Sequence, residues 1–96
     1  MNIKDLKAQD FRVFVEHYRR STKENCLLPL KYFRITKSQK DICSNGGMTV
    51  IVAKKQGKGT ATSVARCSNV DPFQRKVGLE IATKRLEEQL KIQNLI

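Results

Sequence analysis

The chain has 96 residues, 40% of them hydrophobic, which predicts one small domain that buries roughly 60–65% of its unfolded surface. Nineteen lysines and arginines against nine aspartates and glutamates give a net charge of +10, which favours a polyanionic partner such as nucleic acid, a nucleotide or an acidic protein. No apolar run approaches the ~20 residues of a membrane span, and no signal peptide is recognisable, so we expect a cytoplasmic protein with free thiols at its three cysteines.

The first half of the chain predicts strands separated by irregular segments. Met1–Asp10 is expected to form a short helix or turn anchored by Leu6. Residues 11–20 are rich in β-branched and aromatic side chains and predict a strand with apolar groups on both faces. Residues 28–36 predict a second strand, which Pro29 restricts to an edge or an irregular start. The polar stretch from Lys37 to Gly47 predicts a loop.

The second half predicts a hairpin followed by a long helix. Residues 48–54 and 60–68 are the clearest strands, and the glycine-bearing segment between them indicates an antiparallel turn. The helix is predicted over residues 72–93. Asp71 is its expected N-cap, Pro72 suits the first helical position, and Gln74 stands where a capping-box partner belongs. Together these elements predict an α+β domain, with a small antiparallel sheet of three to five strands and one long C-terminal helix packed on it.

One side of the predicted helix combines apolar residues with two arginines. At about 100° per residue this side carries Arg75, Gly78, Leu79, Ala82, Arg85, Leu86 and Leu90. Arg75 and Arg85, with little side-chain volume between them, suggest a slot for an anion, since guanidinium groups grip phosphate oxygens bidentately. The alternative is close packing of Gly78 and Ala82 against another backbone. The apolar surface of the helix is also wider than packing on one sheet requires. This surplus predicts self-association, with Gly78, Ala82 and Leu86 at the interface.

Polar residues surround the expected junction between the last strand and the helix. Arg66 adds positive charge there, and Asn69 offers a neutral hydrogen-bond partner. Asp71 suits a ribose or base edge better than a phosphate, although ordinary capping explains it equally well. The first strand adds Phe14 and Tyr18 as candidate stacking surfaces for a base, if they do not belong to the core.

The sequence shows no arrangement that favours catalysis or metal binding. It contains no paired-carboxylate motif, no Gly-x-Ser-x-Gly and no metal-ligand spacing. Its single histidine is His17, and nothing near Cys43 or Cys67 in the sequence would activate either thiol as a nucleophile. We therefore expect a protein that is not an enzyme and that uses no cofactor or metal.

A family resemblance points in the same direction. The matching pattern is Gly46-Gly47-Met48-Thr49-Val50, then Val64-Ala65-Arg66-Cys67-Ser68, then Asp71, Phe73, Arg75-Lys76, Gly78, Ile81-Ala82 and Arg85. Over roughly Gly46 to Leu86, under half of the chain, this pattern resembles the first described family of Thoeris anti-defence sponges, which are small proteins encoded by phages. The resemblance implies an antiparallel sheet followed by a C-terminal helix, and assembly as dimers or trimers of dimers in the host cytoplasm. Members of the family sequester cyclic ADP-ribose isomers made by host immune enzymes without cleaving them, and some also hold cyclic oligonucleotides at separate sites.

Carried onto this chain, the resemblance implies particular roles for the candidate residues. Arg75 and Arg85 would contact the pyrophosphate, Asn69 and Asp71 would meet ribose or base edges, and Phe14 or Tyr18 would stack on adenine. The expected function is capture of a cyclic nucleotide immune signal by a phage or prophage protein. The alternatives are a basic nucleic-acid-binding or CRISPR-inhibiting phage protein, and an adaptor whose wide helix face binds another protein.

Overall fold

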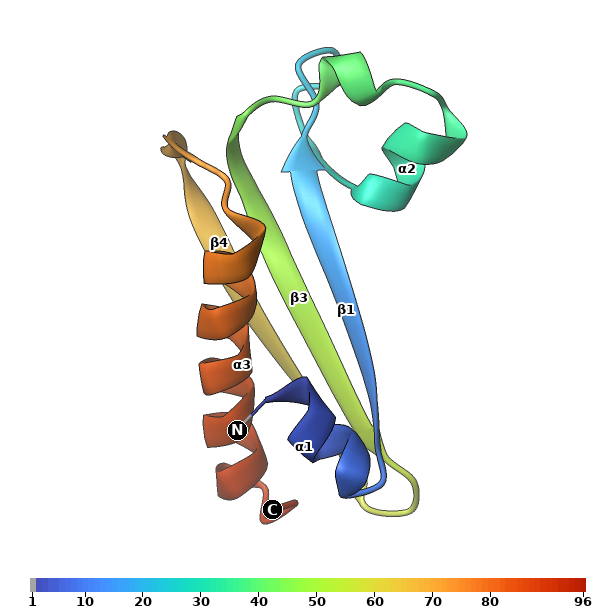
Figure 1. Ribbon diagram of the computed structural model, residues 1–96, viewed down its shortest axis with the longest axis vertical. Coiled ribbons are helices and arrows are strands. Elements are labelled where there is room, and N and C mark those ends of the chain that lie inside the picture. The colour runs from blue at the N-terminus through green and yellow to red at the C-terminus, as the bar shows by residue number, and fades with distance from the viewer. Residues whose placement is uncertain (1) are drawn as a thin grey trace.

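The computed structural model describes residues 2–96, and Met1 lies outside the described residues. Its elements are α1 (Ile3–Ala8), β1 (Phe11–Arg20), β2 (Leu27–Pro29), α2 (Leu30–Ile35), the 3-10 helix η1 (Gln39–Asp41), β3 (Asn45–Lys55), β4 (Gly59–Pro72) and α3 (Arg75–Ile92). The strands form one antiparallel sheet in the order β2-β1-β3-β4, and α1 and α3 lie on the same side of it (Figure 1). The predicted α+β class, with a small antiparallel sheet and a long C-terminal helix, is confirmed.

The hairpin of β3 and β4 forms most of the sheet. Lys58 donates its backbone N–H to the carbonyl of Lys55 over 3.0 Å, and Gly57 has a φ of 74°, a conformation that a residue with a side chain rarely adopts. The glycine-bearing segment therefore closes a tight turn, as the sequence predicts. The first strand also has its predicted bounds, residues 11–20.

Small residues on the sheet allow α3 to lie close to it. The face of the sheet that α1 and α3 cover, called the covered face below, carries Ala53 on β3 and Ala61 and Ala65 on β4, each at most 5% exposed. From the helix, Leu86 and Leu90 are fully buried in the same cluster, to which Leu6 of α1 also belongs. Because alanines leave room above the sheet, the leucines of α3 fill the space between the two layers. The expected anchoring role of Leu6 is thus confirmed.

Residues 28–36 do not form the predicted strand. Only Leu27–Pro29 pairs with β1, and the chain then turns into α2. Pro29 has a φ of −63° and a ψ of 147°, which ends the strand and places it at the N-cap of the helix. Phe33 is fully buried one turn into this helix. The apolar residues at positions 30 and 33 follow helical spacing, and this period decides the local structure.

The start of α3 lies three residues after the predicted start at residue 72. Asp71 and Pro72 still belong to β4, and Gln74 is the N-cap residue, with no side-chain hydrogen bond to the helix. The capping box predicted from Asp71, Pro72 and Gln74 is therefore wrong. The chain stays extended because Pro72 pairs with Asn45 of β3 and because the Phe73 N–H donates to the Ser44 carbonyl over 3.0 Å.

Gly47 accounts for the position of Phe73. A β-carbon at Gly47 would lie 2.6 Å from the Phe73 ring and 2.9 Å from the Tyr18 carbonyl oxygen, and its φ is 134°. Glycine is therefore required at this position, since any side chain would displace the ring. The ring of Phe73 packs onto the sheet there, and α3 begins two residues later.

The second face of the sheet is not covered by α1 or α3. We call it the open face, and it consists of the even-numbered residues of β1, β3 and β4, which alternate with the core residues. Phe14 on this face is 61% exposed, and Val64 is 40% exposed.

Candidate functional site

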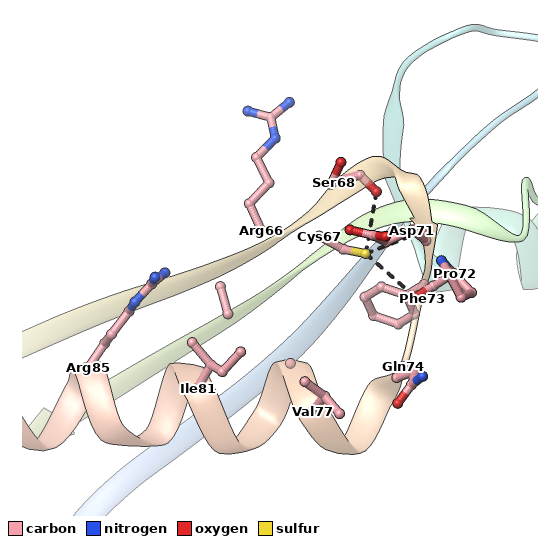
Figure 2. Close-up of a pocket in the computed structure, with 12 residues that line it drawn as sticks. Arg66, Cys67, Ser68, Asp71, Pro72, Phe73, Gln74, Val77, Ile81 and Arg85 are labelled. Atoms are coloured by element: carbon pink, nitrogen blue, oxygen red, sulfur yellow. Dashed lines mark hydrogen bonds between the residues drawn. The ribbon is translucent and has the colours of Figure 1, made fainter.

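A groove of about 400 Å³ lies between β4 and the first half of α3 (Figure 2). Its lining residues are Ala65, Arg66, Cys67, Ser68, Asp71, Pro72, Phe73, Gln74, Val77, Gly78, Ile81 and Arg85. The volume falls within the range of small-molecule pockets, which is about 300–1,000 Å³.

Apolar side chains form one wall of the groove. Val77 and Ile81 of α3 are 44% and 42% exposed, and Figure 2 shows them in succession along the helix between the Phe73 ring and Arg85. Phe73, which precedes α3, stands four residues before Val77, and Val77 stands four residues before Ile81. Gly78 and Ala65 add little side-chain volume. The wall is therefore flat and apolar, as a surface for a ring system would be.

Arg85 stands at the far end of this wall. Its Nη1 donates to the backbone carbonyl of Val64 over 2.7 Å, which holds the guanidinium between α3 and the outer edge of β4 (Figure 2). The guanidinium has five N–H donors, and within residues 2–96 the Val64 carbonyl is the one acceptor that they contact. The other donors are available to an anion in the groove.

The opposite end of the groove is the N-terminus of α3. Backbone N–H groups of a first helical turn have no partner within the helix, and the helix dipole makes this end positive. The first turn of α3 contains no acidic residue, and it carries Arg75 and Lys76, whose charges add to the dipole. The groove therefore has the Arg85 guanidinium at one end and the positive end of the helix dipole at the other, joined by an apolar wall.

The bend of β4 closes the groove beside the helix start. The Cys67 sulfur lies 3.5 Å from the carbonyl oxygens of Ser68 and Asp71 and 3.6 Å from that of Pro72 (Figure 2). Its S–H group therefore donates to backbone carbonyls within the bend of β4. Ser68 and Asp71 contribute the hydroxyl and carboxylate of the lining. These groups suit the hydroxyls of a sugar better than a phosphate.

The structure gathers only some of the predicted site residues in the groove. Arg85, Asp71 and Arg66 line it, although Figure 2 shows the Arg66 side chain extending away from α3. Arg75 does not line the groove. It lies on the other flank of the helix start, where its charge acts on His17. A slot bounded by Arg75 and Arg85 is therefore not present.

Three further predicted ligand-binding residues lie elsewhere. Phe14 and Tyr18 belong to the open face, because their side chains alternate with those of Val13 and His17 on the covered face. Neither can stack on a base held in the groove. Asn69 does not line the groove either; its side-chain oxygen lies 2.9 Å from the position of a β-carbon on Gly46.

The predicted oligomer interface of Gly78, Ala82 and Leu86 is wrong for this fold. Ala82 and Leu86 have no exposed surface, and the Ser63 hydroxyl donates to the Ala82 carbonyl over 2.7 Å. Gly78 packs on Thr49 of the sheet. These residues allow close approach of α3 to its own sheet, which is the packing alternative that the sequence left open.

Several groove residues are not predicted as binding residues from the sequence. Phe73, Val77 and Ile81 recur at four-residue spacing, a signal that could have identified the apolar wall. Nothing in the sequence predicts that Cys67 and Gln74 line the groove, because their place there depends on how far β4 extends before the helix begins.

A second cluster lies beneath the start of α3. The Phe73 and His17 rings meet edge to face, with their centroids 5.9 Å apart. The Arg19 guanidinium lies 4.5 Å from the centroid of the Phe73 ring. His17 Nδ1 is 2.9 Å from the Thr49 hydroxyl. Burial lowers the pKa of His17, and the charges of Arg75 and Arg19 lower it further. His17 is therefore neutral near pH 7 and serves the packing of Phe73.

Another cleft, of about 720 Å³, lies between α1 and α3. Lys4 and Lys84 line it together with Glu80 and Glu87, so its charges are balanced. The groove beside β4 is the better candidate for an anionic ligand.

No protein-family model, curated protein or solved structure matches this chain. Across residues 2–96, no group of three or more His, Cys, Asp or Glu side chains is placed to hold a metal ion. No helix in that range is long and apolar enough to span a membrane.

Proposed function

We propose that the groove between β4 and α3 binds a cyclic nucleotide and holds it without chemical change. The observation that carries this proposal is the position of Arg85. Its side chain is fixed by the Val64 carbonyl, and its remaining donors border an apolar wall of suitable size. A guanidinium held in place before binding loses little conformational entropy when it meets a phosphate.

The remaining lining suits the other parts of such a ligand. A base fits against Phe73, Val77 and Ile81, since a flat ring gains most from a flat apolar wall. Ribose hydroxyls pair with Ser68 and Asp71, and a second phosphate is attracted by the N-terminus of α3. Phe73 thus replaces Phe14 and Tyr18 as the proposed stacking residue.

The biological role that we propose is anti-defence. Capture without turnover lowers the free concentration of a signalling nucleotide, as the resemblance to Thoeris anti-defence sponges implies for a phage or prophage protein in the host cytoplasm. The same resemblance implies a homo-oligomer.

A capture-and-release experiment tests this function. The purified protein is incubated with separate cyclic ADP-ribose isomers and cyclic oligonucleotides, filtered to remove free ligand, and denatured, and the released material is identified by mass spectrometry. The expected result is stoichiometric recovery of one class of ligand with its mass unchanged. Recovery of a cleaved product would identify an enzyme instead, and no uptake from the whole panel would reject the proposal.

A further inference from the structure

The open face combines exposed aromatic and cationic side chains at a distance from the groove. Phe14 lies on β1, which is a middle strand of the sheet, and Tyr18 follows it four residues later on the same face. At about 3.4 Å per residue the two residues stand roughly 14 Å apart along the strand. In a common class of RNA-binding domain, aromatic rings on the middle strands of a four-stranded sheet stack on unpaired bases.

The charges of this face lack the partners that a protein surface normally supplies. Arg12 on β1 stands directly opposite Lys54 on β3, and both are exposed. Like charges in directly opposed positions destabilise a sheet. Within residues 2–96 neither side chain forms an ion pair. A polyanion lying across this pair would relieve the repulsion.

Two further cations belong to the face. Arg20 of β1 donates to the Asn25 side-chain oxygen over 2.7 Å, and Arg66 stands opposite Met48, itself opposite Tyr18. The face has one carboxylate, that of Glu16, which accepts a hydrogen bond from the Tyr18 hydroxyl at 3.4 Å. Positive charge therefore lies at both ends of a surface whose middle contains the exposed Phe14 ring.

The charge of the face selects among the possible occupants. A second copy of the chain would bring the same cations to the contact, with a single carboxylate on each side to offset them. A nucleic-acid duplex would offer phosphates, but its stacked bases cannot reach the Phe14 ring. We propose that the open face binds single-stranded nucleic acid, with phosphates at Arg12 and Lys54 and a base stacked on Phe14.

Fluorescence anisotropy with labelled single-stranded oligothymidylate, oligouridylate and a duplex of equal length tests this proposal. We expect Phe14→Ala to weaken binding of the single strands about tenfold. The double variant Arg12→Ala/Lys54→Ala should reduce the slope of log K against log salt by about one to two. Ile35→Ala and Lys84→Ala are the matched controls for an exposed apolar residue and an exposed cation away from the face. They should bind as the unaltered chain does.

The same measurements separate this surface from the groove. Arg85→Ala should leave oligonucleotide binding unchanged, and Phe14→Ala should leave cyclic nucleotide capture unchanged. Tighter binding of the duplex, undiminished binding by Phe14→Ala, no binding of any oligonucleotide, or loss of binding in Arg85→Ala would each overturn the proposal. Sedimentation equilibrium provides a further check, since a dimer that Phe14→Ala dissociates would assign the face to self-association instead.

Discussion

Gly78 of α3 lies directly against Thr49 of β3. A β-carbon on Gly78 would come within 2.6 Å of the Thr49 hydroxyl oxygen, although helix propensity alone favours alanine over glycine by about 1 kcal/mol. We expect Gly78→Ala to lower the free energy of unfolding by about 1–3 kcal/mol, because the clash exceeds the propensity gain. Urea denaturation followed by circular dichroism measures the change.

A double-mutant cycle identifies the cause of this loss. Thr49→Ala removes the hydroxyl that meets the new β-carbon, so Gly78→Ala should cost far less in that background than in the unaltered chain. Equal costs in the two backgrounds would show that the Thr49 contact does not explain the glycine.

Arg85→Ala tests the contribution of the guanidinium to ligand capture. A hydrogen bond to a charged group is worth about 1.5–3 kcal/mol, so we expect cyclic nucleotide affinity to fall roughly 10- to 100-fold in calorimetric titration. Arg85→Lys should recover only part of the loss, since lysine cannot contact the Val64 carbonyl and a phosphate with one planar fork. Lys84→Ala removes a neighbouring cation that does not line the groove and should bind normally. Similar affinities for Arg85→Ala and Lys84→Ala would argue against the groove as the binding site.

Gly47→Ala tests whether the missing side chain at Gly47 provides the space for the Phe73 ring. The added β-carbon would meet this ring at 2.6 Å, and the backbone conformation is itself unfavourable for alanine. Gly57→Ala is a suitable comparison, because Gly57 also has a positive φ but has nothing within 4 Å of an added β-carbon. We expect Gly57→Ala to cost about 1–2 kcal/mol of stability and Gly47→Ala to cost clearly more. Equal thermal stabilities would show that the ring is not held by this contact.

The pH dependence of stability should report on His17. Its pKa in the folded chain lies below the ordinary value of 6.5, so below about pH 6.5 the unfolded chain binds a proton that the folded chain does not. Stability should therefore decrease as the pH falls from 6.5, with a slope of at most about 1.4 kcal/mol per pH unit from this group. Denaturant titrations between pH 5 and 7.5 measure the slope, and His17→Gln should flatten it. A slope that persists in His17→Gln would assign the effect to other groups.

The elements of this fold that follow from local periodicity could be predicted from the sequence. The alternation of residues 11–20, the turn at Gly57 and the apolar spacing of α3 are properties of short segments, and each is present in the structure. The end of β4 depends instead on pairing between Pro72 and Asn45, which are far apart in the sequence. Local capping signals at Asp71 therefore gave the wrong helix start.

The site was harder to predict for the same physical reason. Helical spacing placed Arg75 and Arg85 on one side of α3, but it could not show that Thr49 and Ser63 fill the strip between them. Once Gly78 and Ala82 lie on the sheet, Arg85 is turned toward the edge of β4 and Arg75 toward His17. Phe73 enters the groove only because Gly47 accepts its ring.

The hydrogen bond from Arg85 to Val64 also bears on how this chain avoids aggregation. β4 is an edge strand of 14 residues. The unpaired backbone groups of an edge strand can pair with strands of other molecules unless something obstructs them. The guanidinium occupies an outward carbonyl that an incoming strand would need, and its charge repels a second molecule of the same kind. Mutation of Arg85 would therefore remove both the proposed anion contact and an obstacle to the addition of further strands.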